Sequence, residues 1–439
     1  MLPGILLPSL FIAGAASSAA ADFYVSARSS YEHSARGDSS SDDGAEVEMV
    51  ASAWFAGWHA QNFSLDDVSW DKYTHLTYAF KVSTEDPSDV TLPDEDATLL
   101  PQFVAKAREN DVKALLSLGG WGGSLYFSTN VGDETNRTKF VNAVTQLVDQ
   151  YHLDGIDFDW EYPGRQGIGC NAISPNDTAN FLTFLQELRN TTSCSSTLLT
   201  AAVSLTPFAD ENEEPLADVT EFAKVLDYIE IMNYDVWGSW STAAGPNAPL
   251  NDTCAGEENQ QGSAVSAVAT WTAAGMPVSQ IVLGVPGYGH SFAVNSTSAF
   301  DDSELAAYPP FNASEFPVGD PWDDTPGLDV CGNEENQGGI QDFWNLVGSG
   351  MLLENGTAAS GVPYRFDDCS KTEYIYNVTS NVLISYDGPS AFAAKGEFIK
   401  NMGLRGFSIW EAGGDSKDVL LDAIRNAAGF DDDDCGNWY

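Results

Sequence analysis

Basic residues are scarce in this chain of 439 residues. Nineteen Lys and Arg stand against 64 Asp and Glu, and the formal net charge is −45. Such a negative field argues against nucleic acid and against an anionic membrane surface as partners. A neutral or cationic substrate agrees better with the charge, although the charge can also serve only to keep the protein soluble.

Long hydrophobic runs are missing as well. After the first residues no stretch reaches about 18 uninterrupted apolar residues, so no membrane span is expected. The apolar segment 5–16, followed by small residues, predicts a signal peptide over 1–21, although no Lys or Arg precedes it. Residues 22–48 are rich in Ser, Asp and Gly and predict a disordered or processed lead-in, and 431–439 form an acidic tail. We therefore expect a secreted, extracellular protein.

Glycosylation sequons agree with export, because nine in one chain are unusual by chance. They begin at Asn62, Asn136, Asn176, Asn190, Asn251, Asn295, Asn312, Asn355 and Asn377.

Short apolar runs typical of buried strands alternate with stretches of helical period from residue 51 onward. Eight strands are predicted: Ala51 to Gly57, Thr74 to Phe80, Lys113 to Gly119, Gly155 to Tyr162, Leu199 to Leu205, Tyr228 to Asp235, Ile281 to Gly289 and Gly406 to Ala412. The pattern predicts an α/β fold, a (β/α)8 TIM barrel, whose active site gathers at the carboxyl ends of the strands. A doubly wound sheet is the alternative, but the sequence has no Gly-rich phosphate loop.

The spacing between the seventh and eighth strands is far longer than one helix needs. It predicts a small α+β insertion domain over 291–384 that walls one side of the active-site cleft, with the barrel formed by 49–290 and 385–430. A long decorated loop is the alternative.

The six cysteines show no C-x-x-C metal spacing, and an even number in an exported chain indicates disulfides. Cys331 is expected to pair with Cys369, since both fall in the predicted insertion. Cys170 is expected to pair with Cys254, since both should lie in loops on one barrel face. These pairs leave Cys194 with Cys435.

The most informative run is Asp154-Gly155-Ile156-Asp157-Phe158-Asp159-Trp160-Glu161-Tyr162-Pro163. Alternation along a strand would point three carboxylates, those of Asp157, Asp159 and Glu161, into the barrel. Burying them is costly, which favours a catalytic role. A metal site or a salt-bridged core is the alternative. The run contains no His and basic residues are few, so we expect no metal and no cofactor.

The three carboxyl groups predict different roles. Close carboxylates cannot all be ionised, so at least one keeps its proton near neutral pH. Glu161, nearest the barrel mouth, can act as the general acid. Asp159 can share a proton with Asp157 and then turn toward the substrate, so that their titrations are coupled.

The same run resembles the DxxDxDxE signature of glycoside hydrolase family 18, the chitinases. Three further motifs resemble that family in the expected order: Ser117-Leu118-Gly119-Gly120-Trp121, Met232-Asn233-Tyr234-Asp235, and Trp410 on the eighth strand. The runs Trp54–His59 and Lys72–Tyr78 resemble fungal members. His290 stands where many relatives with this insertion carry Arg.

The resemblance implies a mechanism in which the acetamido oxygen of the substrate attacks the anomeric carbon. Glu161 would be the acid and then the base, and Asp159 would hydrogen-bond the acetamido N–H. Asp157 would tune Asp159, and Tyr234 would contact the acetamido carbonyl. Asp235 would contact the sugar at the cleavage point.

Aromatic faces suit pyranose rings. The predicted substrate-binding residues are Trp410, Trp121, Tyr162, Met232, Asp235, Tyr288, Trp58 and Trp237. Ordinary core packing is the alternative for any one aromatic side chain.

The resemblance predicts a monomeric, secreted chitinase that binds chitin and chito-oligosaccharides and cleaves β-1,4 links between N-acetylglucosamine units with retention. We expect a mildly acidic optimum. Two alternatives are a chitin-binding lectin-like protein on the same fold and an endo-β-N-acetylglucosaminidase that acts on N-glycans.

Overall fold

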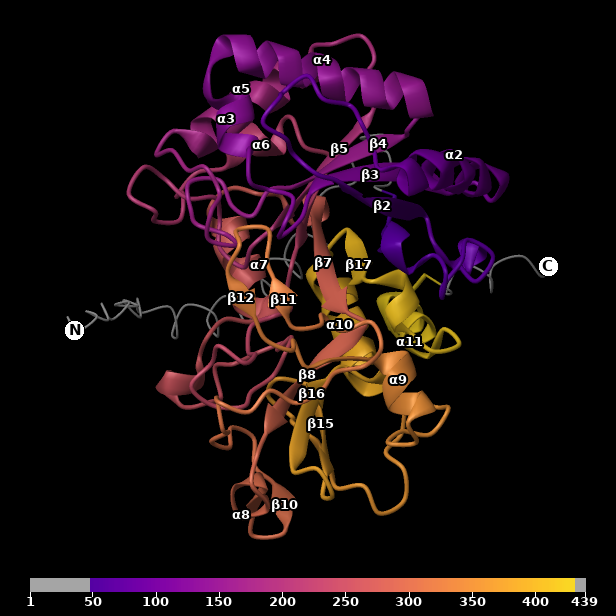
Figure 1. Ribbon diagram of the computed structural model, residues 1–439, viewed down its shortest axis with the longest axis vertical. Helices are drawn as coiled ribbons and strands as arrows, with labels where there is room; N and C mark the ends of the chain where they lie inside the picture. The colour runs from indigo at the N-terminus through magenta and orange to yellow at the C-terminus, as the bar shows by residue number, and fades with distance from the viewer. Residues whose placement is uncertain (1–47, 431–439) are drawn as a thin grey trace, which may run out of the picture. The chain divides into compact units, whose positions relative to one another are not determined.

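In the computed structural model, which describes residues 48–430, eight parallel strands form a closed barrel (Figure 1). The order around the barrel is β1-β17-β7-β6-β5-β4-β3-β2, so the strands follow chain order and the last closes on the first. The barrel strands are β1 (Val50–Ala56), β2 (His75–Lys81), β3 (Lys113–Gly119), β4 (Gly155–Asp159), β5 (Leu198–Val203), β6 (Tyr228–Ile231), β7 (Ile281–Pro286) and β17 (Gly406–Trp410). The predicted TIM barrel is confirmed.

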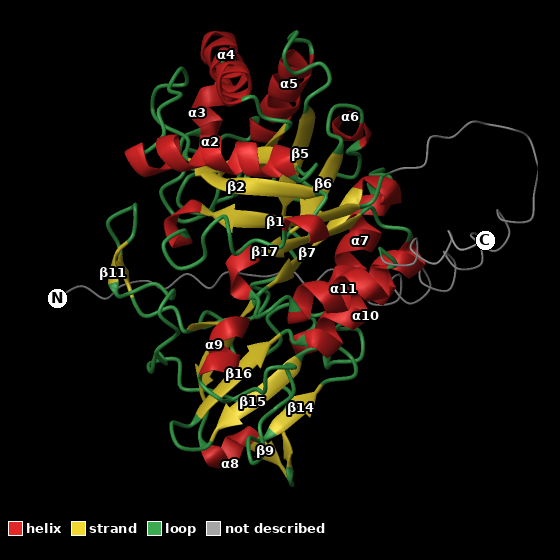
Figure 2. Cartoon of the chain, turned by 90° about the vertical axis from the view of Figure 1, so that its right-hand side faces the viewer, coloured by secondary structure: helices red, strands yellow, loops and turns green. Residues whose placement is uncertain are grey.

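Helices cover the outside of the barrel strands (Figure 2). They are α2 (Asp94–Glu109), α3 (Phe127–Gly132), α4 (Glu134–Tyr151), α5 (Asp177–Arg189), α6 (Thr220–Ala223), α7 (Ala264–Ala273), α10 (Pro389–Met402) and α11 (Val419–Ala428). Helix α4 shows why these segments form: the side chain of Asp133 caps its first turn by accepting the backbone N–H of Asn136, and apolar side chains such as Val144 and Leu147 recur on its buried face.

Short 3-10 helices connect several of these elements. They are η1 (Gly57–His59), η2 (Trp70–Lys72), η3 (Glu257–Asn259), η4 (Val278–Gln280) and η5 (Ala412–Gly414). Within residues 48–430, no helix has the length and apolar character that crossing a bilayer requires.

Strand β4 ends at Asp159, three residues before the predicted end. Asp159 is paired with Gly119 of β3, and its carbonyl oxygen accepts the N–H of Gly120, just after β3, at 2.9 Å. Gly119 makes this approach possible, because a Cβ there would lie 2.0 Å from the same carbonyl oxygen. The chain therefore turns at the barrel mouth, and Glu161 lies just beyond the strand.

The insertion between β7 and β17 is built on a five-stranded antiparallel sheet. Its strands, in spatial order, are β13 (Ile340–Asp342), β8 (Tyr288–Ala293), β16 (Val382–Tyr386), β15 (Glu373–Asn377) and β14 (Tyr364–Phe366). The smaller elements are α8 (Ser296–Ala299), β9 (Phe300–Asp301), β10 (Glu304–Leu305), β11 (Gly327–Leu328), β12 (Glu334–Glu335) and α9 (Phe343–Gly348). The run predicted as one seventh strand is in fact two, because after Pro286 the chain leaves the barrel and pairs in this sheet.

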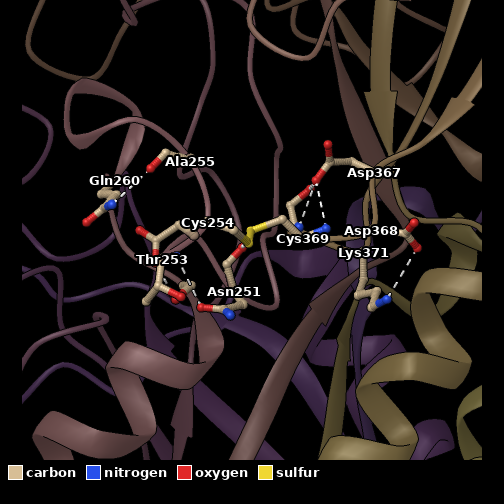
Figure 3. Close-up of a disulfide and its surroundings, with 12 residues drawn as sticks. Asn251, Thr253, Cys254, Ala255, Gln260, Asp367, Asp368, Cys369 and Lys371 are labelled. Carbon is tan, nitrogen blue, oxygen red and sulfur yellow. Dashed lines mark hydrogen bonds and ion pairs between the residues drawn. A yellow bond between two sulfur atoms is a disulfide. The ribbon is translucent and has the colours of Figure 1, made fainter. Parts of the chain in front are cut away.

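Both disulfides of the described residues join a barrel loop to the insertion. Cys170, after β4, bonds to Cys331, and Cys254, after β6, bonds to Cys369. Figure 3 shows the second bridge, with the loop of Cys369 held by backbone N–H groups that donate to Asp367.

The predicted pairs Cys331–Cys369 and Cys170–Cys254 are therefore wrong. Cysteines of one insertion, or of one barrel face, need not meet, because pairing depends on which loops the fold brings within Cα distances of about 6 Å. Cys194 is buried and forms no disulfide within residues 48–430. Cys435 lies outside the described residues, so the Cys194–Cys435 pair stays a prediction.

Candidate active site

Asp157 lies inside the barrel near the carboxyl end of β4 and is fully buried. Three donors from other strands hold it: Ser117 Oγ at 2.7 Å, Thr200 Oγ1 at 2.8 Å and Trp54 Nε1 at 3.2 Å. Burial raises the pKa of Asp157, and these hydrogen bonds oppose that rise. The side chain is fixed, and the three donors offset part of the cost of burying its charged form.

Asp159 is buried two residues further along β4, and its Oδ1 has no hydrogen-bond partner among the described residues. Burial raises its pKa well above the ordinary value, and the neighbouring charges of Glu161 and Asp157 add to the effect. Asp159 is thus a carboxyl group that tends to keep its proton and has one oxygen without a partner. Such a group can turn from Asp157 toward the substrate.

Glu161 is 8% exposed at the mouth of the barrel. Burial raises its pKa to about 7; the charge of Asp235 adds to the rise and a hydrogen bond with Tyr162 opposes it. A carboxyl group in this range can donate a proton near neutral pH and take it back, as a general acid and base must.

The backbone of Glu161 is held by two side chains that the sequence prediction missed. Ser124 Oγ accepts the N–H of Glu161 at 3.1 Å and lies 2.9 Å from the carbonyl oxygen of Asp159. Asn171 donates to the carbonyl oxygen of Glu161 at 3.1 Å. Both lie in loops outside any recognisable motif, so only the folded structure identifies them.

Tyr234 follows β6 on the same side of the barrel. Burial raises its pKa well above the ordinary value, with the charge of Asp159 the next cause, so the phenol stays a hydrogen-bond donor. Gly284 of β7 leaves room for the ring, because a Cβ there would lie 3.1 Å from Tyr234 Cε1. Met232 is half-buried below it, against the cluster of Trp54, Ala79 and Ala202.

Asp235 is exposed, and its Oδ1 has two partners from β8. Tyr288 donates its hydroxyl at 2.8 Å, and Nε2 of His290 lies 2.8 Å away. Trp240, 62% exposed, packs its ring edge to face against His290 at 5.4 Å. Trp240 was missed by the sequence prediction, because it lies in a loop well beyond the strand end.

Aromatic rings form a continuous layer at the barrel mouth. Phe80, Trp410 and Trp58 contact one another, with ring centroids 5.5 Å (Phe80–Trp410), 5.9 Å (Phe80–Trp58) and 6.3 Å (Trp58–Trp410) apart. Trp58 is 54% exposed, and Trp121 is 49% exposed in the loop after β3. Large exposed indole faces beside a carboxyl pair suit a sugar ligand.

Two other predicted aromatic residues have less exposed surface. Tyr162 is half-buried beside Glu161, with the guanidinium of Arg165 5.9 Å from its ring centre. Trp237 is 2% exposed and packs against Tyr308, so the structure supports core packing for Trp237, not sugar stacking.

Beside β1, the insertion contacts the barrel mouth through a pair of stacked rings. Trp322 stacks on His59, which follows β1, at 4.1 Å. His59 Nδ1 lies 2.7 Å from Oε1 of Glu411, the residue after Trp410. The insertion therefore borders the site beside Trp410.

Glu230 of β6 is a further carboxyl group inside the barrel, and the sequence prediction missed it. The same alternation that placed Met232 and Tyr234 on one face would have included Glu230. Among residues 48–430 no group of three His, Cys, Asp or Glu is arranged to hold a metal ion.

Comparison with known proteins agrees with this geometry. The profile of "Glycosyl hydrolases family 18" matches residues 51–415. The chain is 52% identical over 384 residues to a chitinase-like effector of Moniliophthora roreri, covering 87% of this chain and 93% of that protein. It is 49% identical over 386 residues to a chitinase-like effector of Moniliophthora perniciosa, covering 87% and 88%.

The fold is also similar to that of a solved chitinase from Rhizomucor miehei. The TM-score is 0.77 at 32% identity, and the match covers 86% of this chain and 100% of that one. The protein therefore belongs to glycosyl hydrolase family 18.

Proposed function

We propose that the protein is a secreted chitinase that hydrolyses β-1,4 linkages between N-acetylglucosamine units with retention. The observation that carries the proposal is the pairing of Glu161, whose pKa is raised to about 7, with Asp159, whose Oδ1 has no partner among the described residues. One group can move a proton at the scissile bond, and the other can bind a polar group of the substrate.

In the first step Glu161 donates its proton to the glycosidic oxygen while the bond from that oxygen to the anomeric carbon breaks. The carbonyl oxygen of the substrate's acetamido group forms the new bond to the anomeric carbon, giving an oxazolinium ion. Asp159 accepts a hydrogen bond from the acetamido N–H and so stabilises the positive charge of the oxazolinium ion. Tyr234 donates a hydrogen bond to the acetamido carbonyl region.

In the second step Glu161 acts as a base. It takes a proton from a water molecule, whose oxygen attacks the anomeric carbon as the bond to the acetamido oxygen breaks. Two inversions give net retention. The mechanism needs an N-acetyl group next to the scissile bond, so cellulose and starch would not be substrates.

Export and glycosylation are part of the proposal. The predicted signal peptide lies outside the described residues, but every sequon lies after residue 48, and none of the nine asparagines is buried. Accessible sequons are what N-glycosylation requires.

A second candidate function is a chito-oligosaccharide-binding effector without catalysis. It is favoured by the two relatives named chitinase-like effector. The presence of Glu161, Asp159 and Tyr234 together in this chain favours the enzyme.

Release of a fluorescent aglycone from a chitotriose conjugate tests the enzyme directly, with Glu161→Gln as the matched variant. We expect the variant to lose about three or more orders of magnitude in kcat and to keep oligosaccharide binding by calorimetry. An inactive wild type that binds chitotriose would support the effector instead, and equal activity in both proteins would remove Glu161 from the mechanism. An N-glycan substrate in parallel tests the endo-β-N-acetylglucosaminidase alternative.

A further inference from the structure

Glu230 is a buried acid that the mechanism above does not use. It lies on β6 between Ala202 of β5 and Val282 of β7, and its side chain is 1% exposed. Neither of its carboxyl oxygens has an N–H or O–H partner in hydrogen-bonding geometry within the described residues. A buried carboxylate with no donor would carry a large desolvation cost, so the ionised form is strongly disfavoured.

The groups that face Glu230 are almost all acidic or neutral. Asp157 on β4 is the carboxyl group that raises the pKa of Glu230 most, and the hydroxyls of Ser408 on β17 and Thr200 on β5 lower it to a smaller extent. The charge of Glu230 also raises the pKa values of Asp159, Tyr228 and Tyr234.

Among the described residues, the cation Arg405 lies beside β6 but is directed to other groups. Its guanidinium lies 5.0 Å from the ring centre of Tyr228 and donates to the backbone carbonyl of Asp227. It forms no ion pair with Glu230.

Two neighbouring carboxylates without a cation cannot both be ionised, so Glu230 and Asp157 hold at least one proton between them. The hydrogen-bond donors around the two carboxyl groups determine which of them holds the proton. Asp157 accepts three hydrogen bonds, which stabilise its negative form, whereas Glu230 accepts none in good geometry. Burial raises the pKa of Glu230 well above its ordinary value, and the charge of Asp157 raises it further. A hydrogen bond with Glu230 acts on Asp157 in the opposite direction, lowering its pKa.

We propose that Glu230 is a positioning residue for the reaction: it keeps a proton inside the barrel and donates it in a hydrogen bond to Asp157. This inference rests on the proposed chitinase function. When Asp159 turns to the substrate with its proton, Asp157 is left as a buried anion. The carboxyl group of Glu230 then supplies a fourth donor to that anion, and its proton stays on Glu230 throughout.

Two variants separate this role from packing. Glu230→Gln keeps the size and an N–H donor, and Glu230→Leu removes the donor. With the chitotriose conjugate we expect Glu230→Gln to keep kcat within about threefold, and Glu230→Leu to lower kcat about 10- to 100-fold, as loss of a hydrogen bond to a charged group predicts. KM should stay within about threefold in both, because Glu230 does not reach the substrate.

The pH profile gives a second readout. Without its fourth donor Asp157 becomes easier to protonate, so the acidic limb of kcat should move to higher pH in Glu230→Leu and stay in place in Glu230→Gln. A Leu variant with the wild-type limb and kcat, or a Gln variant as impaired as the Leu variant, would overturn the inference. Inactivity of the wild type would instead count against the proposed function.

Infrared difference spectroscopy tests the proton without reference to activity. One component of the carbonyl stretch of protonated carboxylic acids should be present in the wild type at pH 6 and absent from Glu230→Gln, while the components of the other protonated acids remain. Glu373→Gln, which changes another buried acid far along the chain in the insertion, is the matched control and should leave kcat unchanged. A carboxylate band at position 230 would show that Glu230 is ionised and that the inference is wrong.

Discussion

His290 Nε2 lies 2.8 Å from Oδ1 of Asp235, the oxygen that also accepts the hydroxyl of Tyr288. His290 thus orients the carboxylate that we expect to contact the sugar at the cleavage point. His290→Phe should raise KM for chito-oligosaccharides about tenfold, since a hydrogen bond to a charged group is worth about 1.5–3 kcal/mol. Steady-state kinetics on the chitotriose conjugate measures the change. His152→Asn, at an exposed position with left-handed backbone, is the control that should behave as wild type; an equal rise in KM there would refute a specific role for His290.

Activity should fall as the pH rises through about 7, because Glu161 must be protonated to donate and burial raises its pKa to about 7. Below that pH Glu161 keeps its proton, so the optimum should be mildly acidic. The measurement is kcat for the conjugate between pH 4 and 9 in buffers of constant ionic strength. A rate that climbs steadily above pH 7 contradicts this assignment.

Trp58→Ala and Trp121→Ala should each raise KM for long oligosaccharides about tenfold and leave kcat for the short conjugate nearly unchanged, because each loses an exposed stacking face. Trp237→Ala is the matched control: its ring is buried, so the cost should appear as a loss of about 3–5 kcal/mol in unfolding free energy. Calorimetric binding and denaturant unfolding distinguish the two effects. The interpretation fails if Trp237→Ala weakens binding while the stability holds.

Removing the Cys254–Cys369 bridge should destabilise the protein by about 2–5 kcal/mol, because the bridge closes a long loop between the barrel and the insertion. The double variant Cys254→Ser/Cys369→Ser avoids a new unpaired thiol. Its Tm by calorimetry should fall, while kcat on the short conjugate at a temperature well below Tm should stay near wild type. An unchanged Tm would mean that the bridge constrains little.

The stability of the insertion should depend on Glu373. Burial, and then the charge of Asp387, raises the pKa of Glu373 to about 8, above the ordinary 4.5. A carboxyl group that binds its proton more tightly when folded contributes stability fully below about pH 4.5, and this contribution is lost as the pH rises through about 8. Tm should therefore fall between pH 5 and 9 more steeply in the wild type than in Glu373→Gln. Parallel curves for the two proteins would show that Glu373 does not titrate in this range.

Much of the barrel could be predicted from local pattern alone. Strand β3 was predicted with the observed bounds, because Lys113 to Gly119 is apolar and ends at a glycine. The predictions failed where a strand end depends on a partner. The pairing of β4 with β5 ends at Phe158 and its pairing with β3 ends at Asp159, and β8 separates from β7 because it pairs with β16 and β13.

The sequence by itself determined the eight-strand order and the run that brings Asp157, Asp159 and Glu161 to one barrel, because alternation and hydrophobic period are properties of neighbouring residues. Only the tertiary structure decided which cysteines bond, that Trp237 is buried while Trp58 is exposed, and that the carboxyl groups of Glu230 and Asp157 interact inside the barrel. Those outcomes depend on contacts between residues far apart in the chain, and on the burial that sets each carboxyl group's proton affinity.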